Sequence, residues 1–283
     1  MTEVVSGKKL SEEILSDVRK RVSEYSTGVP CLCVVLVGED PASQVYVRIK
    51  DKAARECGIE SRQLRLPATT SEAELLRVVD GLNRDPSVHG ILVQLPLPNG
   101  IDAARVSLAL DPAKDVDGLH PISAGRLLAN KSGFAPCTPL GCIYILDHHR
   151  VPIEGANAVV IGRSEIVGKP VSLLLLHRNA TVTICHSRTR DLPEIARRAD
   201  ILVAALGKPK FVQGDWIKPG AAVIDVGVNR VDGKLIGDVD FAAANGRAGV
   251  LTPVPGGVGL LTVAMLLRNT LQAFEAQAAQ RRT

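Results

Sequence analysis

The sequence of 283 residues has few aromatic side chains, no long apolar run and no strong excess of either charge. Aromatic residues make up only 3% of the chain, so alanine, valine, leucine and isoleucine must form most of the core. No apolar run approaches the roughly 20 residues that a membrane-spanning helix needs. The N-terminal residues are polar and contain no apolar segment typical of a secretory signal. We therefore expect a cytoplasmic protein that has no membrane partner.

The cysteines lack the spacing of a metal site or of a redox pair. No Cys-x-x-Cys pair occurs, and no group of histidines and cysteines has zinc-finger spacing. We therefore expect no metal site, and reduced thiols that pack mostly as small buried apolar side chains. These thiols are Cys31, Cys33, Cys57, Cys137, Cys142 and Cys185.

The formal net charge of +4 is mild and is dispersed along the chain. No basic stripe with interleaved aromatic residues occurs, so the sequence does not predict a nucleic-acid partner. A small positive charge suits an anionic substrate and a phosphorylated cofactor, although solubility alone explains it equally well.

Helix and strand patterns alternate along the first half of the chain. Continuous apolar runs at 31–37 and 90–96 predict strands that are covered on both faces. Apolar residues at helical spacing predict a helix over 10–25, and another is expected over about 44–57. Helix ends are marked by Gly58 as a stop, Ser71 with Glu74 as a capping box, and Thr138 before Pro139 as a start.

A second series of buried strands is predicted at 156–162, 181–185, 201–207 and 221–228. Asp232-Gly233 predicts a hairpin turn, and a long helix is expected over about 260–280. Repeated alternation of strands and helices is typical of α/β layering with parallel sheets. We therefore predict two α/β domains that flank a cleft. They cover residues 1–140 and 141–261, and the last helix, about 262–283, packs back on the first domain.

The strand predicted at 156–162 leads through a glycine-rich turn into an apolar helix. A strand, a glycine turn and a helix N-terminus together favour binding of a pyrophosphate. The turn has glycines at Gly162 and Gly168, with five residues between them in place of the usual G-x-G-x-x-G spacing. The signal is therefore moderate, and a simple strand–helix turn is the alternative.

The end of the next strand indicates which dinucleotide is bound. Proteins that prefer NAD usually carry an acidic residue there, which holds a ribose hydroxyl. Here residues 186–189 read His-Ser-Arg-Thr, and no carboxylate occurs before Asp191. Arg163 and Arg188 are candidate partners of a 2′-phosphate, because guanidinium groups match phosphate oxygens. The sequence therefore favours NADP over NAD, with two solvated surface arginines as the alternative.

Four polar residues of the first half are candidates for the chemical site. Tyr46 and Lys50 lie four residues apart on a predicted helix, so they project from one face. The Tyr-x-x-x-Lys pair of short-chain dehydrogenases follows the nucleotide motif, whereas this pair precedes Gly162, so that interpretation fails. Gln94 sits in an apolar strand and needs a hydrogen-bond partner, and Asp117 falls in a turn-rich stretch of the kind where sites form. Alone, the Tyr–Lys pair is more often a helix surface.

Five motifs occur in one order along most of the chain. They are YVRIK at 46–50, GILVQLPLP at 90–98, KDVDG at 114–118, GRSEIVGKP at 162–170 and TPVPGGVG at 252–259. Together they resemble the bifunctional methylenetetrahydrofolate dehydrogenase–cyclohydrolase family of the bacterial FolD type. The resemblance implies that residues 1–140 form a folate-binding catalytic domain and that residues 141–261 form a Rossmann-type NADP-binding domain.

The resemblance also implies roles for individual residues. Tyr46 would stack on the folate, Lys50 and Gln94 would work together in catalysis, and Asp117 would bind the pterin ring. The second glycine-rich loop would lie near the substrate through Pro255, Gly256 and Gly257, with a plain turn as the alternative. The implied cofactor contacts are Gly162, Arg163, Ser164, Ser187 and Val228.

The implied reaction is oxidation of 5,10-methylenetetrahydrofolate with NADP, followed by hydrolysis of the methenyl product to 10-formyltetrahydrofolate. Hydride removal needs close alignment with the nicotinamide more than an acid or a base. Hydrolysis needs proton transfer, which a lysine that is neutral part of the time would provide. The resemblance further suggests a homodimer. The alternatives are a related dehydrogenase with another substrate, such as shikimate, and a catalytically silent NADP-binding module.

Overall fold

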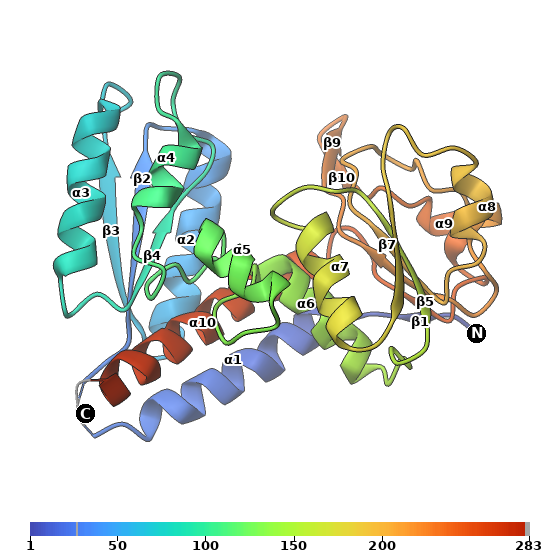
Figure 1. Ribbon diagram of the computed structural model, residues 1–283, viewed down its shortest axis with the longest axis horizontal. Helices are drawn as coiled ribbons and strands as arrows, with labels where there is room; N and C mark the ends of the chain where they lie inside the picture. Colours follow the sequence, from blue (N-terminus) through green and yellow to red (C-terminus); the bar gives the residue numbers. More distant parts are fainter. Residues whose placement is uncertain (27, 281–283) are drawn as a thin grey trace. The chain divides into compact units, whose positions relative to one another are not determined.

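The computed structural model describes residues 1–26 and 28–280 (Figure 1). The chain divides into two compact units. A six-stranded unit comprises residues 1–11 and 136–262, and a three-stranded unit comprises residues 12–135 and the chain from Val263 onward. The first boundary between the units, at residues 11 and 12, lies inside helix α1 (Gly7–Ser23). The last boundary, at residues 262 and 263, lies inside helix α10 (Val258–Gln280). The functional division at residue 140 stays a prediction.

The three-stranded unit is built on a parallel sheet of strand order β3-β2-β4. Its strands are β2 (Cys31–Val37), β3 (Glu60–Leu66) and β4 (Gly90–Val93). All residues of β2 are buried, which confirms the central strand predicted from the apolar run. Alternate residues of β2 pack with Leu75, Val79 and Val106 on one face of the sheet. Strand β3 was not predicted, because its sequence ESRQLRL is polar and only partly buried at the sheet edge.

Helices cover both faces of this sheet. Helix α2 (Pro41–Glu56) packs against β2 and β3, while α3 (Glu72–Arg84) and α4 (Ala103–Ala109) pack against the opposite face. A short helix α5 (Pro121–Leu128) follows. Helices α1 and α10 lie side by side (Figure 1), and Arg21 on α1 bonds to Glu275 on α10 at 2.6 Å.

Local signals account for most of these helix ends. The predicted capping box is present, with Ser71 and Glu74 bonding to each other's backbone N–H. Helix α2 ends before Gly58, whose φ of +75 lies in the left-handed region that glycine adopts without strain. Its start at Pro41, capped by Asp40, lies a few residues earlier than predicted, since Asp40 accepts a bond from Ser43 N at 2.7 Å.

The six-stranded unit contains a parallel sheet of order β1-β11-β8-β7-β5-β6. The strands predicted in the second half of the chain are confirmed as β5 (Asn157–Ile161), β6 (Thr181–Cys185), β7 (Ile201–Ala204) and β8 (Ala222–Asp225). The short strands β1 (Glu3–Val4) and β11 (Val250–Leu251) were not predicted, because two residues carry no periodic pattern. The remaining elements are α6 (Cys137–His148), α7 (Gly168–His177), α8 (Leu192–Ala196), η1 (Gly214–Trp216) and α9 (Phe241–Ala244).

A hairpin turn and a helix start were predicted from the sequence of this unit. The predicted hairpin is confirmed, because β9 (Asn229–Val231) and β10 (Lys234–Ile236) are antiparallel and joined by Asp232 and Gly233, both with positive φ. The predicted helix start at Thr138 is wrong. Helix α6 begins at Cys137 after Pro136, and the Thr138 hydroxyl instead bonds to the Thr262 hydroxyl at 2.9 Å.

The order of the strands defines one functional edge of the six-stranded sheet. From β5 the chain moves to β6 on one side and then crosses to β7 on the other side. In such sheets ligands bind outside the carboxyl ends of the strands, at the point where the order reverses. Residues 161, 185, 204 and 225 end the neighbouring strands β5, β6, β7 and β8 in register, so the loops that follow them start at the same edge.

Within the described ranges, no helix combines the length and the apolar character that crossing a membrane requires.

Candidate functional site

The predicted Tyr–Lys pair lies on α2 in the three-stranded unit. Tyr46 is 48% exposed, and Lys50, one turn later, is partly buried. The Lys50 ammonium donates to the side-chain oxygen of Gln94 at 2.8 Å. The sequence separates these two residues widely, and the structure brings them together because α2 packs against the sheet that contains β4.

Gln94 follows β4 and is not inside it, which corrects the sequence-based placement. The strand ends at Val93, although the Gln94 N–H still donates to Val35 O at 2.9 Å and so anchors the residue to the sheet. Its side-chain amide donates to Leu95 O at 2.7 Å, which leaves its oxygen for Lys50. The expected hydrogen-bond partners of this amide are thus Lys50 and the next residue of the chain. The bond to Leu95 orients the Gln94 side chain, and the Gln94 oxygen then positions the Lys50 ammonium.

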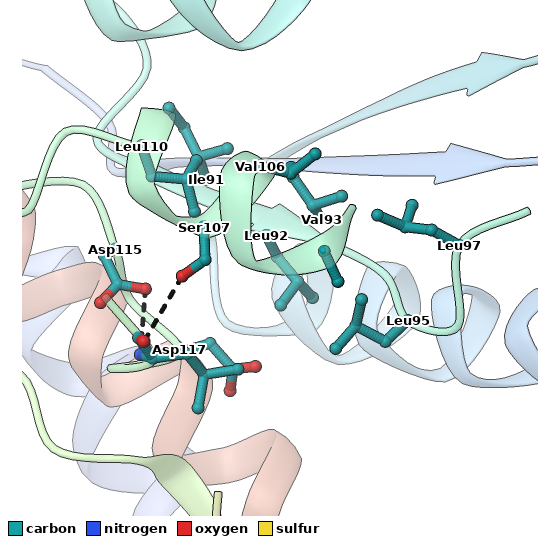
Figure 2. Close-up of a pocket in the computed structure, with 12 residues that line it drawn as sticks. Ile91, Leu92, Val93, Leu95, Leu97, Val106, Ser107, Leu110, Asp115 and Asp117 are labelled. Carbon is teal, nitrogen blue, oxygen red and sulfur yellow. Dashed lines mark hydrogen bonds between the residues drawn. The ribbon is translucent and has the colours of Figure 1, made fainter. Parts of the chain in front are cut away.

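Asp117 lines a small cavity of about 50 Å³ beside the end of β4. Figure 2 shows apolar side chains from β4 and α4 along the cavity, which Asp115 and Asp117 also line. Leu95 lines the same cavity and also accepts the bond from Gln94, so it connects the two parts of the candidate site. Ligand sites usually enclose hundreds of cubic ångströms, so this cavity is small for a ligand site.

The loop that carries Asp117 is shaped by Asp115, a residue that sequence analysis did not select. Asp115 is 1% exposed, and its carboxylate accepts bonds from Leu119 N at 3.2 Å, His120 N at 2.8 Å and Ser123 Oγ at 2.9 Å. Ser107 on α4 also donates to Leu119 O at 3.4 Å (Figure 2). The only signal in the sequence is the alternation of acids in KDVDG, which does not reveal which acid is buried.

The two glycines of the nucleotide motif touch each other in the six-stranded unit. Gly162 follows β5 with a φ of +131, and a Cβ there would overlap the carbonyl of Ala205. A Cβ on Gly168, the first residue of α7, would overlap the carbonyl of Gly162. Glycine is therefore required at both positions, because strand, turn and helix approach too closely for a side chain. The strand, the turn and the helix thus form a cradle that fits a phosphorylated cofactor, because its phosphates must come close to the protein backbone.

Ser164 organises the turn between these glycines. Its hydroxyl accepts bonds from the N–H groups of Val167 and Gly168, both at 3.2 Å, and its carbonyl accepts from Lys169 at 3.0 Å. The first amides of α7 are therefore engaged by Ser164, which the sequence-based picture of an open helix N-terminus did not anticipate. Arg163 and Ser164 themselves are exposed at the carboxyl edge of the sheet.

Ser187 and Val228 lie at the same edge as Gly162. Ser187 follows β6 and is exposed in a turn that is closed by a bond from His186 N to Thr189 Oγ1 at 2.8 Å. Val228 follows β8 and is 53% exposed. The register of the parallel strands thus brings together predicted cofactor residues that lie far apart in the sequence.

The predicted substrate residues of the second glycine-rich loop belong to this six-stranded unit, whereas Tyr46, Lys50, Gln94 and Asp117 belong to the three-stranded unit. Pro255 and Gly256 are exposed, and Gly256 has a φ of +102. Gly256 O accepts a bond from Gly7 N at 2.9 Å, which ties the loop to the start of α1. A Cβ on Gly257 would overlap the carbonyl of Pro253, so the turn requires glycine there.

These features define a class of protein. A parallel sheet with a reversal of strand order, a glycine cradle after β5 and exposed residues at the neighbouring strand ends form a Rossmann-type dinucleotide-binding unit. The other α/β unit contains a lysine held by a glutamine amide, and a mostly apolar cavity that two aspartates also line.

Family models identify the chain more closely. The model for the catalytic domain of tetrahydrofolate dehydrogenase/cyclohydrolase matches residues 5–117, and the model for the NAD(P)-binding domain of the same family matches residues 136–278. The chain belongs to the tetrahydrofolate dehydrogenase/cyclohydrolase family.

Individual relatives agree with this assignment over nearly the whole chain. The bifunctional protein FolD of Brucella ovis is 56% identical over 287 residues, which cover 96% of each chain. The structure of the bifunctional FolD enzyme from Campylobacter jejuni has 44% identity and a TM-score of 0.95, covering 98% of this chain and 99% of that one. The FolD structure from Trypanosoma brucei, complexed with NADP and an inhibitor, has 40% identity and a TM-score of 0.93, covering 98% of each chain. The predicted family and α/β fold class are confirmed.

Proposed function

We propose that this chain oxidises 5,10-methylenetetrahydrofolate with NADP and hydrolyses the methenyl product to 10-formyltetrahydrofolate. Both family models match, and relatives at up to 56% identity are bifunctional. The observation that carries the assignment to residues is the 2.8 Å bond between Lys50 and Gln94 beside Tyr46, because it provides an oriented proton-transfer group in the catalytic domain.

In the oxidation step, the residues of this chain bind and align the substrate. Gly162, Ser164 and Val228 would hold NADP, which would supply the acceptor for the hydride of the methylene carbon. The folate nitrogens would stabilise the cation that remains. Tyr46 is exposed and offers a ring face for stacking against the folate. The Asp117 carboxylate offers an acceptor for the amino and ring N–H groups of the pterin at its cavity. Alignment of this kind is what hydride transfer mainly requires.

In the hydrolysis step, Lys50 moves the protons. Water adds to the methenyl carbon and loses a proton to the neutral form of the Lys50 amine. The resulting ammonium then protonates the folate nitrogen that leaves. The C–N bond breaks, and the hydroxyl of the adduct releases its proton to solvent to give the formyl product. Gln94 holds the Lys50 nitrogen in place through its side-chain oxygen during both transfers. A base positioned in this way is the usual requirement for general acid–base catalysis.

The preference for NADP rests on the turn after β6. Ser187 and Arg188 are exposed there, Arg163 is exposed after β5, and the turn at 186–189 contains no acidic residue. We assign Arg163, Arg188 and Ser187 to the 2′-phosphate, because a guanidinium and a hydroxyl bind phosphate oxygens that a carboxylate would repel. A relative solved with NADP supports the same cofactor.

The deciding assay mixes purified protein with methylenetetrahydrofolate and either NADP or NAD, and follows reduced nicotinamide and folate products separately. Formation of 10-formyltetrahydrofolate with NADP is expected. Methenyl product alone would refute the role of Lys50 in hydrolysis. No turnover with either cofactor would favour the alternatives, a dehydrogenase with another substrate or a silent NADP-binding module.

The assembly that we propose is a cytoplasmic homodimer. Strand β6 is an edge of the six-stranded sheet, and it exposes Ile184, while the adjacent helix α7 exposes Leu176. An exposed strand edge with apolar side chains favours pairing with a second copy. Sedimentation equilibrium is expected to give twice the mass of the chain, and Ile184→Lys is expected to shift the equilibrium toward the monomer.

A further inference from the structure

Two buried carboxylates that the proposed chemistry does not use lie behind the cofactor edge. Asp225 is the last residue of β8 and is 3% exposed, and Asp238 follows the β9–β10 hairpin and is fully buried. Buried acids carry a large desolvation cost, so their hydrogen-bond partners indicate what they do.

Asp238 binds the backbone of the loop that follows β7. Its carboxylate accepts bonds from three successive backbone N–H groups, those of Leu206 at 2.5 Å, Gly207 at 2.9 Å and Lys208 at 2.8 Å. A fourth bond, at 2.9 Å, comes from the side-chain amide of Asn229, which directly follows Val228. Successive amides that converge on one anion form a rigid concavity. Asp238 therefore sets the shape of the β7 loop and connects it to the segment after β8.

Asp225 holds the other side of the same segment. One carboxylate oxygen accepts from Gly227 N at 2.9 Å and from Asp238 N at 3.0 Å, and the other accepts from Val239 N at 2.9 Å. The backbone N–H of Asp225 donates to Thr252 Oγ1 at 2.7 Å, at the start of the second glycine-rich loop. Val228 is thus held between Gly227, which bonds to Asp225, and Asn229, which bonds to Asp238.

Two glycines show how closely the backbone follows these carboxylates. A Cβ on Gly227 would overlap the carboxyl group of Asp238, and a Cβ on Gly237 would overlap that of Asp225. The β7 loop in turn lies against the nucleotide cradle, because Ala205 O contacts the position that a Cβ on Gly162 would occupy. The contacts form a continuous series from the two acids to the cradle.

We propose that Asp225 and Asp238 are positioning residues that hold the loops after β7 and β8, including Val228, in the shape that accepts NADP. This inference rests on the proposed use of NADP at this edge. Neither carboxylate touches the reacting atoms. Their partners are amides of the two loops, so loss of either acceptor releases backbone that faces the cofactor.

The test is Asp238→Asn, which preserves the shape of the side chain but replaces one accepting oxygen with a donor. Two of the four donors then lose their acceptor. The KM for NADP is expected to rise about tenfold or more. Hydrolysis of supplied methenyltetrahydrofolate, which uses no hydride transfer, is expected to stay within about twofold of wild type. The matched control is Asp232→Asn, which removes the same charge from the exposed hairpin turn and keeps a residue suited to positive φ.

A second variant, Gly227→Ala, keeps both charges and presses a methyl group against Asp238. It is expected to raise the KM for NADP in the same way, and it replaces Asp238→Asn if that variant does not fold. Direct titration of the reduced cofactor NADPH, followed by its own fluorescence or by that of tryptophan, separates this inference from the proposed function, because it reports binding even without turnover. An unchanged NADP affinity in both variants would overturn the inference, as would equal loss of dehydrogenase and hydrolase activity.

Discussion

Replacing Lys50 with methionine is expected to separate the two activities. Methionine keeps most of the length and apolar contact of the lysine side chain but cannot carry or transfer a proton. The hydrolysis step loses its proton-transfer group, and positioned acids and bases contribute about 100- to 10,000-fold to such steps. The hydrolase activity of Lys50→Met is therefore expected to fall at least about 100-fold.

The dehydrogenase activity is expected to fall much less. Dehydrogenase activity falls because the side-chain oxygen of Gln94 loses its hydrogen-bond donor, the Lys50 ammonium at 2.8 Å. A hydrogen bond to a charged group contributes about 1.5–3 kcal/mol, and the lower value applies because Lys50 is partly exposed. About 1.5 kcal/mol corresponds to roughly a tenfold loss. The two activities should therefore differ in their response by at least about tenfold.

The assay measures NADPH formation and the decay of supplied methenyltetrahydrofolate in parallel. Lys52→Met is the matched control, because Lys52 lies on the same helix with its side chain 78% exposed and forms a surface ion pair with Glu56 at 3.8 Å. This control is expected to retain both activities. Equal loss of both activities in Lys50→Met, with folate still bound, would refute the proposed division of labour.

Three further predictions follow from the same geometry. Asp117→Ala is expected to weaken folate binding at least about tenfold while NADP affinity stays constant, and calorimetric titration that finds unchanged folate affinity would contradict the role of Asp117. Arg188→Ala is expected to raise the KM for NADP but not for NAD, so equal effects on both cofactors would exclude a contact with the 2′-phosphate. Burial, with a smaller contribution from Asp238, raises the pKa of the Asp225 carboxyl from 3.8 to about 6. Because the folded state keeps this proton to higher pH, the stability that Asp225 contributes below about pH 4 is lost as the pH rises through 6, by about 3 kcal/mol. Urea unfolding should show that Asp225→Asn removes this dependence, and parallel pH profiles for the two proteins would refute it.

Many local features could be predicted from the sequence because they depend on neighbouring residues. The apolar run at 31–37 identified the buried strand β2, and Ser71 with Glu74 identified the start of α3. Asp232-Gly233 identified the hairpin, because few other residues adopt positive φ at successive positions. Thr138 shows the limit of such signals. Its hydroxyl could cap a helix, but the chain context placed it inside the first turn with a distant threonine as partner.

The candidate site was predicted only in part. Motif order and family resemblance selected Tyr46, Lys50, Gln94 and Asp117, and the structure places Lys50 in contact with Gln94. The residues that support the site were missed, because nothing in the sequence distinguishes the buried Asp115, Asp225 and Asp238 from exposed acids. Whether an acidic residue is buried depends on which backbone amides the fold places beside its carboxylate.

The sequence by itself determined the strand and helix periods, the turns that require glycine, and the family of the protein. These properties are local, or they depend on the order of motifs along the chain. The tertiary structure decided which strand ends meet at one edge, which acids are buried and what their carboxylates hold. The physical reason is that parallel strands are joined by long connections, so their register and the loops beyond them depend on contacts between distant residues.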